Sequence, residues 1–202
     1  MSPAFLACVN ETLDDFEKGY QRDPNDRGNW TGGAVGAGVL IGTNRGISAP
    51  VLAAWRKTPC TEADMRALTR EEALAIYEQR YWIPLHGDDL PLPLAYVCFD
   101  AEVMSGMGNA TLHKHRTVAW LQGALGVQID DQLGPVTLSS ASVCADVAGA
   151  VREFCRRRLA FLQADPDWAH FGRGWQRRCE RIEAMALALI HPAAAPAAGA
   201  AP

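Results

Sequence analysis

A helical pattern that stops abruptly is the feature of this chain that most constrains its fold. Apolar side chains recur at helical spacing along residues 3–20, at Phe5, Leu6, Val9, Leu13, Phe16 and Tyr20. Ser2 and Pro3 are suitable as the N-cap and the first helical residue. The segment GYQRDPNDRG, residues 19–28, then brings a proline and several turn formers. The predicted helix therefore ends near Tyr20.

One acid of this helix, Glu17, faces inward. It lies about 40° from Leu13 around the helix axis, at the edge of the apolar stripe. In the last turn the helix dipole and partial burial both disfavour a carboxylate, so we expect a raised pKa, as a general acid needs. The alternative is a structural glutamate at the edge of the core, paired with an arginine.

Composition excludes several classes of protein. The chain has 202 residues and a formal net charge of −4, which gives no overall signal for nucleic-acid binding. Six cysteines occur without a CxxC pair, which predicts reduced, mostly buried thiols and no metal site. With neither a basic leader segment nor a run of 18 apolar residues, we expect a soluble product, made in the cytoplasm and not inserted into membranes.

The rest of the chain predicts a mainly α protein with a small glycine-rich β-hairpin or loop after the first helix, at residues 28–48. Thr69 and Glu72 form the pattern of a capping box at the start of a helix that ends by Pro84. Further helices are expected at 94–104, from 109 to about 126, at 142–163 and at 168–190. Asp100 is expected to satisfy buried polar groups, and the arginines of the last third to line a solvated helix face.

The order of polar residues around the first helix suggests a chemistry. An acid at a helix end, followed by a polar hairpin, is the arrangement by which lysozyme-like enzymes hold a glycosidic bond. Glu17 is the candidate proton donor, Asp26 the electrostatic or basic partner, and a following threonine the residue that positions water. A carboxyl separation of about 5 to 5.5 Å would indicate retention of configuration, and about 6.5 to 9.5 Å inversion.

Eight motifs then match, in order, those of one family. They are Glu17-Lys-Gly-Tyr20, Asp23-Pro-Asn-Asp26-Arg-Gly28, Thr43-Asn-Arg-Gly-Ile-Ser48, Glu72-Ala-Leu-Ala-Ile-Tyr77 with Tyr81-Trp82, Phe99-Asp-Ala-Glu-Val-Met-Ser-Gly106, Leu121-Gln-Gly-Ala-Leu-Gly126, Asp131-Gln-Leu-Gly-Pro-Val-Thr-Leu138 and Phe171-Gly-Arg-Gly-Trp-Gln-Arg-Arg178. The chain resembles the glycoside hydrolase family 108 N-acetylmuramidases, phage-type endolysins with a C-terminal predicted peptidoglycan-binding region.

The resemblance implies a lysozyme-like catalytic region at 1–108 and a helical peptidoglycan-binding region at 109–190 packed with it. The composition of the Ala/Pro tail at 191–202 predicts that it is disordered. The resemblance also places the family's catalytic acid on Glu17. The substrate-binding candidates are Tyr20, Thr31, Arg45 and Ser105. Two positions depart from the family: Arg45 replaces a tyrosine, and Met104 stands where the family has an asparagine. Two hydroxyls remain candidates for positioning water: Thr43 is preferred and Thr31 is the reserve.

The resulting hypothesis is a muramidase that cleaves the β-1,4 bond between N-acetylmuramic acid and N-acetylglucosamine, without a cofactor, in phage-type host lysis. The rivals are a lytic transglycosylase, a non-catalytic wall-binding module and a secretion-assisting protein. The partner is the peptidoglycan glycan strand. A chain made in the cytoplasm must reach the wall, which suggests dependence on a holin-like membrane-permeabilising protein or on a secretion machine.

Overall fold

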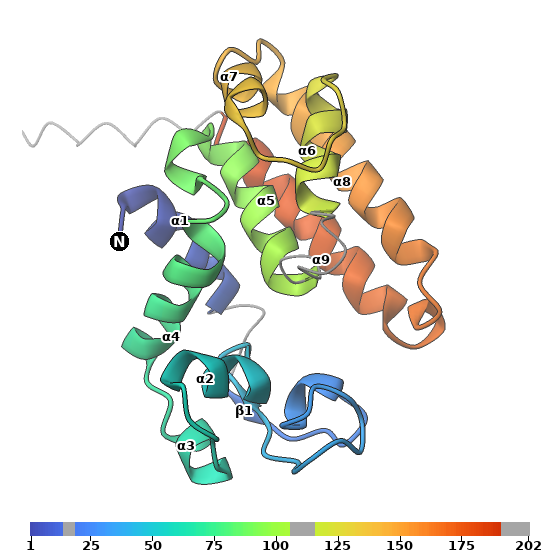
Figure 1. Ribbon diagram of the computed structural model, residues 1–202. Coiled ribbons are helices and arrows are strands. Elements are labelled where there is room, and N and C mark those ends of the chain that lie inside the picture. Colours follow the sequence, from blue (N-terminus) through green and yellow to red (C-terminus); the bar gives the residue numbers. More distant parts are fainter. Residues whose placement is uncertain (14–18, 106–115, 191–202) are drawn as a thin grey trace, which may run out of the picture. The chain divides into compact units, whose positions relative to one another are not determined.

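The computed structural model describes residues 1–13, 19–105 and 116–190, and the chain divides into two compact units, Met1–Trp82 and Ile83–Pro202 (Figure 1). Both units are mainly helical, and the first carries a small antiparallel sheet. This confirms the predicted mainly α class with a small β element. The two compact units divide after Trp82. The division into a catalytic region and a binding region at 108/109 concerns function and stays a prediction.

The first helix begins as its sequence predicts. Helix α1 spans Pro3–Glu11, and the Ser2 hydroxyl accepts a hydrogen bond from the Phe5 amide at 3.1 Å. Phe5 and Val9 are fully buried, which confirms the apolar stripe. Thr12 and Leu13 follow in a wider π-type turn. Glu17, predicted to sit in the last turn, lies outside the described residues.

Helices α2 (Ala49–Arg56), α3 (Glu62–Arg66) and α4 (Arg70–Tyr77) complete the helical part of the first unit, and α4 runs on into a π-helical turn, η3 (Glu78–Trp82). Thr69 caps α4 by accepting from the Glu72 amide at 3.1 Å, as predicted. The predicted return bond from the Glu72 carboxylate is wrong, because both of its oxygens accept from Arg56. The complete capping box lies at α3, between Thr61 and Asp64.

The sheet has three two-residue strands, β1 (Tyr20–Gln21), β2 (Thr43–Asn44) and β3 (Ile47–Ser48), in the order β1-β2-β3. Both pairings are antiparallel, with Gln21 opposite Thr43 and Thr43 opposite Ser48. The glycine-rich segment between β1 and β2 is an irregular loop. It holds a 3-10 turn, η2 (Arg27–Asn29), and an isolated bridge between Trp30 and Leu40.

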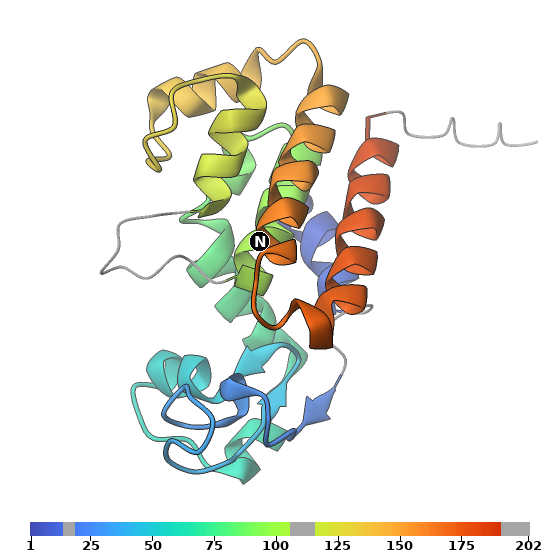
Figure 2. The same ribbon diagram turned by 90° about the vertical axis from the view of Figure 1, so that its right-hand side faces the viewer.

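The second unit is built around α5 (Leu92–Ser105), which follows a 3-10 turn, η4 (Gly87–Asp89). Helices α6 (Arg116–Leu125), α8 (Val147–Gln163) and α9 (Trp168–Ala188) pack against it, and α7 (Pro135–Ser142) packs on α6 (Figure 2). The prediction of one helix from 142 to 163 is wrong at its start. Pro135 begins a separate short helix and Asp146 caps the next by accepting from the Gly149 amide at 2.8 Å.

The core of the second unit contains charge as well as apolar side chains. Asp100 on α5 is buried against Arg158 of α8 and Arg178 of α9. The expectation that Asp100 serves buried polar groups is confirmed. The expectation of a solvated arginine face is wrong for Arg158, which is 0% exposed. All six cysteines are free thiols and five of them are buried, as predicted.

Candidate functional site

Two of the predicted site residues, Asp26 and Thr43, come together around the backbone of Gly28. A Cβ built on Gly28 would lie 3.2 Å from Asp26 Oδ1 and 3.8 Å from Thr43 Oγ1. It would also lie 3.3 Å from the Cβ of Ser48, which pairs with Thr43 across β2 and β3. The glycine thus lets a carboxylate and two hydroxyl side chains converge where a larger residue would crowd them.

Asp26 owes its position to the turn that it caps. Its Oδ1 accepts from the Gly28 amide at 2.8 Å, as an N-cap side chain does at the start of η2. Its Oδ2 accepts from Gln21 Nε2 at 2.9 Å. Because an ionised carboxylate offers about four acceptor positions, each oxygen keeps capacity for a water or a sugar hydroxyl.

Thr43 contributes a hydroxyl that has no partner among the described residues. Its Oγ1 atom is buried and makes no hydrogen bond. Leaving a buried hydroxyl unsatisfied costs about 1–3 kcal/mol, and such groups call for an explanation such as a catalytic role. Thr43 therefore has the free acceptor and donor capacity that positioning a water requires.

Thr31, the reserve candidate, is already engaged. Its Oγ1 accepts from the Val39 amide at 2.9 Å, across the neck of the glycine-rich loop. A Cβ at Gly38 would collide with the same oxygen. The Thr31 hydroxyl thus closes the loop, which favours Thr43 for the role at the site.

The register of the sheet separates its side chains into two faces. Residues directly opposite each other in an antiparallel pair project to the same face, so Gln21, Thr43 and Ser48 share one face. Tyr20 and Asn44 share the other. The Tyr20 hydroxyl donates to the Ile41 carbonyl at 3.0 Å, and the Arg66 guanidinium covers the Tyr20 ring at 3.9 Å from its centroid. Tyr20 is therefore held by protein groups, and its predicted contact with substrate stays a proposal.

Arg45, which replaces a family tyrosine, sits at the β2–β3 turn with a left-handed φ of 50°. Its Nε donates to the Leu68 carbonyl at 3.3 Å and its own carbonyl accepts from the Tyr77 hydroxyl at 3.0 Å. These bonds tie the turn to the segment before α4 and to the last residue of that helix. Ser105 is the last residue of α5 in the second unit, and Glu17 lies outside the described residues, so their predicted roles stay proposals.

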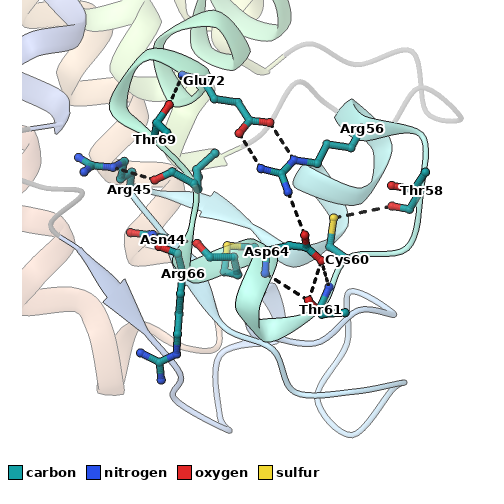
Figure 3. A network of polar contacts seen from close by, with 12 residues as sticks. Asn44, Arg45, Arg56, Thr58, Cys60, Thr61, Asp64, Arg66, Thr69 and Glu72 are labelled. Atoms are coloured by element: carbon teal, nitrogen blue, oxygen red, sulfur yellow. Dashed lines mark hydrogen bonds and ion pairs between the residues drawn. The ribbon is translucent and has the colours of Figure 1, made fainter.

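A polar network behind the sheet fixes the position of β2 (Figure 3). The Arg56 guanidinium binds both oxygens of Glu72, at 2.8 and 2.7 Å, and contacts Asp64 at 3.3 Å. The Asn44 amide donates to the Met65 carbonyl at 2.9 Å. Through these contacts α2, α3 and α4 hold Asn44 in place and, next to it, Thr43.

The site contains residues that the sequence did not single out. Gln21 and Ser48 lie on the same face as Thr43, and Asn29 is fully buried beneath the loop. If the strand register were known, the alternation of side chains would place Gln21 on the same face as Thr43. The register of two-residue strands cannot be predicted from the sequence. Within the described residues, no cluster of acids, histidines and cysteines suits a metal ion. No described helix combines the length and apolar character needed to cross a bilayer.

Comparisons with known proteins place this chain within a family. The sequence pattern of the glycosyl hydrolase 108 family matches residues 10–106, a range that contains Glu17, Asp26 and Thr43. The solved structure of Brucella abortus SagA is similar at 31% identity, with 95% of this chain and 98% of that chain covered and a TM-score of 0.77. No curated protein matches the chain. The chain therefore belongs to the glycosyl hydrolase 108 family, and it is a peptidoglycan-degrading glycoside hydrolase with a lysozyme-like fold.

Proposed function

We propose that this protein is an N-acetylmuramidase that hydrolyses the β-1,4 bond between N-acetylmuramic acid and N-acetylglucosamine. Glu17 is the general acid, Asp26 the second carboxylate and Thr43 the hydroxyl that positions the attacking water. Family membership supports the reaction class. The residue assignments rest on the motif that places Glu17 and on the geometry around Gly28.

The observation that carries the proposal is the convergence of Asp26 and Thr43 on one glycine. One group is a carboxylate with open acceptor positions, and the other is a buried hydroxyl that makes no hydrogen bond within residues 1–13, 19–105 and 116–190. A water between them would donate to Asp26 and bond to Thr43, which would orient one of its lone pairs. Glycoside hydrolysis needs such a water or nucleophile opposite the acid that protonates the leaving oxygen.

The chemical steps follow from these roles. Glu17 gives its proton to the glycosidic oxygen as the bond to the anomeric carbon breaks. Asp26 stabilises the positive charge that develops on the sugar ring and takes up a proton from the water. The water oxygen bonds to the anomeric carbon, and the product carries a reducing-end muramic acid.

The test is mass spectrometry of the fragments that the wild type and a Glu17→Gln variant release from purified peptidoglycan. We expect reducing-end muramic acid from the wild type and none from the variant, with Glu180→Gln as a matched acid-to-amide control on the exposed surface of α9. Wild-type cleavage by Glu17→Gln would remove Glu17 from the mechanism. An anhydro-muramic product would identify a lytic transglycosylase instead.

We propose bacteriolysis of the phage type as the setting, on the resemblance of the motifs to phage-type endolysins. In that setting the enzyme reaches the wall with the help of a membrane-permeabilising, holin-like protein; export by a secretion machine is the alternative. Expression in a bacterial host with and without a co-expressed holin distinguishes the two. Lysis only with the holin supports the first route, and lysis without it contradicts that route.

A further inference from the structure

Gln21 contacts both Asp26 and the loop that follows β1. It lies outside the eight family motifs. It lies on β1 opposite Thr43, on the face of the sheet that Thr43 and Ser48 share. Its side-chain amide touches both the candidate carboxylate and the interior of the loop. These contacts determine which way the oxygen and the NH₂ group of the amide point.

The acceptor end of Gln21 is fixed by two donors. Its Oε1 accepts from the Asp23 backbone amide at 2.9 Å and from Asn29 Nδ2 at 2.7 Å. Asn29 is fully buried, and its Nδ2 also donates to the Asp23 carbonyl at 2.9 Å. With Oε1 committed to these donors, the NH₂ group of Gln21 must point the other way.

The donor end of Gln21 therefore points at Asp26. Nε2 donates to Asp26 Oδ2 at 2.9 Å, while the Gly28 amide donates to Oδ1 at 2.8 Å. These two bonds fix the plane of the carboxylate. Without the Gln21 bond, only the Gly28 amide holds the carboxylate, and its plane is less restrained about the side-chain torsion.

The loop itself is braced independently of Gln21. The Trp30 indole donates to the Pro24 carbonyl at 2.9 Å, and the Asp23 carboxylate accepts from the Asn25 amide at 2.9 Å. The Asp26 amide donates to the Asp23 carbonyl at 3.2 Å. Changing the donor end of Gln21 is thus expected to alter the orientation of the Asp26 carboxylate more than the path of the backbone.

We propose that Gln21 is a positioning residue that orients the Asp26 carboxylate for the reaction. The proposal rests on the function proposed above, since it assigns Gln21 a role through Asp26. Hydrolysis demands that the reacting groups be held close to one geometry, and a displacement of about 1 Å costs on the order of 100-fold in rate.

The decisive variant is Gln21→Glu, because it changes only one end of the side chain. One oxygen of the new carboxylate still accepts from Asp23 and Asn29, while the other replaces the NH₂ donor and faces Asp26. At neutral pH the two carboxylates repel, and at acidic pH they share one proton, which restores a hydrogen bond to Asp26. We expect kcat to fall about tenfold or more at neutral pH with little change in KM, and the pH optimum to move to lower pH.

Two further variants complete the experiment. Gln21→Met removes both ends and is expected to lower kcat at every pH without an acidic shift. Asn25→Asp adds the same charge to the same loop, beside Asp23, and is expected to keep the wild-type pH profile. Initial rates on purified peptidoglycan, measured across pH for all four proteins and for Glu17→Gln, are the measurement.

The outcomes separate the two proposals. A purely structural Gln21 would give Gln21→Glu the wild-type rate and profile while Gln21→Met loses activity, and this result overturns the positioning role alone. An equal acidic shift in Asn25→Asp also overturns it, since the shift would then come from charge and not from contact with Asp26. A wild type that releases no reducing-end muramic acid, or an active Glu17→Gln, overturns the proposed function itself.

Discussion

The Nη2 atom of Arg158 lies 2.7 Å from Oδ2 of Asp100 while both side chains are buried, at 0% and 1% exposure. A second arginine, Arg178, donates from Nε to Asp100 Oδ1 at 2.9 Å. Burial alone would raise the pKa of Asp100, but the charges of Arg178 and Arg158 outweigh it and lower that pKa. The carboxylate thus joins α5, α8 and α9 at one point.

Replacing Asp100 by Asn should destabilise the protein, because it leaves Arg158 buried beside a neutral group. Breaking a buried pair costs about 3–5 kcal/mol in free energy of unfolding. Because the pKa of Asp100 is lower in the folded state, its carboxylate stabilises the fold at pH values above its ordinary pKa of 3.8. This stabilisation is lost as the pH falls through the folded-state pKa. Urea unfolding should therefore show a large difference in free energy of unfolding between the wild type and Asp100→Asn at pH 7. The difference should become smaller in acid.

The control for this experiment is Asp167→Asn. Asp167 is exposed and makes no capping hydrogen bond with its side chain, so its loss should cost less than about 1 kcal/mol. Equal destabilisation by the two variants would contradict the buried-pair account.

For Glu102 we expect the opposite pH dependence of the free energy of unfolding. It is 3% exposed, and burial raises its pKa to about 7, although a hydrogen bond with Thr117 opposes the shift. The folded state then holds a proton that the unfolded state releases near pH 4.5, so the free energy of unfolding falls as the pH rises from about 4.5 to 7. Glu102→Gln mimics the protonated form and should remove a loss of roughly 3 kcal/mol across that window.

Unfolding by urea at pH 5 and at pH 8 measures this effect. The Gln variant should match the wild type at pH 5 and exceed it at pH 8, whereas Glu180→Gln on the exposed face of α9 should change neither value by much. A Glu102→Gln protein that gains nothing at pH 8 would show that the carboxyl is not held in its neutral form.

A comparison of Gly42 with Gly36 distinguishes the cost of backbone strain from the cost of a steric clash. Its φ is +93°, and an added Cβ would lie 2.6 Å from the Gln21 carbonyl and from the Tyr20 ring. Gly36 has a φ of +78° with nothing within 4 Å of an added Cβ. Gly36→Ala should cost about 1–2 kcal/mol in free energy of unfolding, from strain alone. Gly42→Ala should cost more, because β1 and β2 must also separate, and calorimetry of both variants makes the comparison.

Thr43→Val should lower the activity while keeping or increasing the stability of the protein. The substitution keeps the shape of the side chain and removes a buried hydroxyl that has no hydrogen bond, which should stabilise the protein by about 1 kcal/mol or leave its stability unchanged. If Thr43 positions the water, the rate of peptidoglycan cleavage should fall by about 100-fold. Cleavage rates and melting temperatures of the same preparation test both statements.

Thr31→Val provides the contrast between the two threonine candidates. It removes the acceptor for the Val39 amide, so it should destabilise the loop by about 1 kcal/mol and reduce activity less than Thr43→Val does. A larger loss of activity in Thr31→Val would transfer the water-positioning role to Thr31.

Local signals in the sequence predict most of the secondary structure. Ser2, Pro3 and Thr69 start helices because a cap needs only its immediate neighbours. The motifs around Asp26 and Thr43 led to the family and to the pair that meets at Gly28. The separate helix α7 has a weaker local signal, because its N-cap is Gly134, which has no side chain to cap the helix.

The tertiary structure decided what each polar side chain does. Arg156 and Arg157 both pair with Glu153 on their own helix, whereas Arg158 meets Asp100 on α5. Glu72 has the spacing of a capping residue, but the nearby Arg56 offers a charged, bidentate partner that a backbone amide does not match. Caps, helix breakers and ordered motifs, which are local in the chain, predict most of the helix boundaries and the family. Partner choice, register and the orientation of Gln21 depend on residues far apart in the chain, whose contacts exist only once the chain has folded.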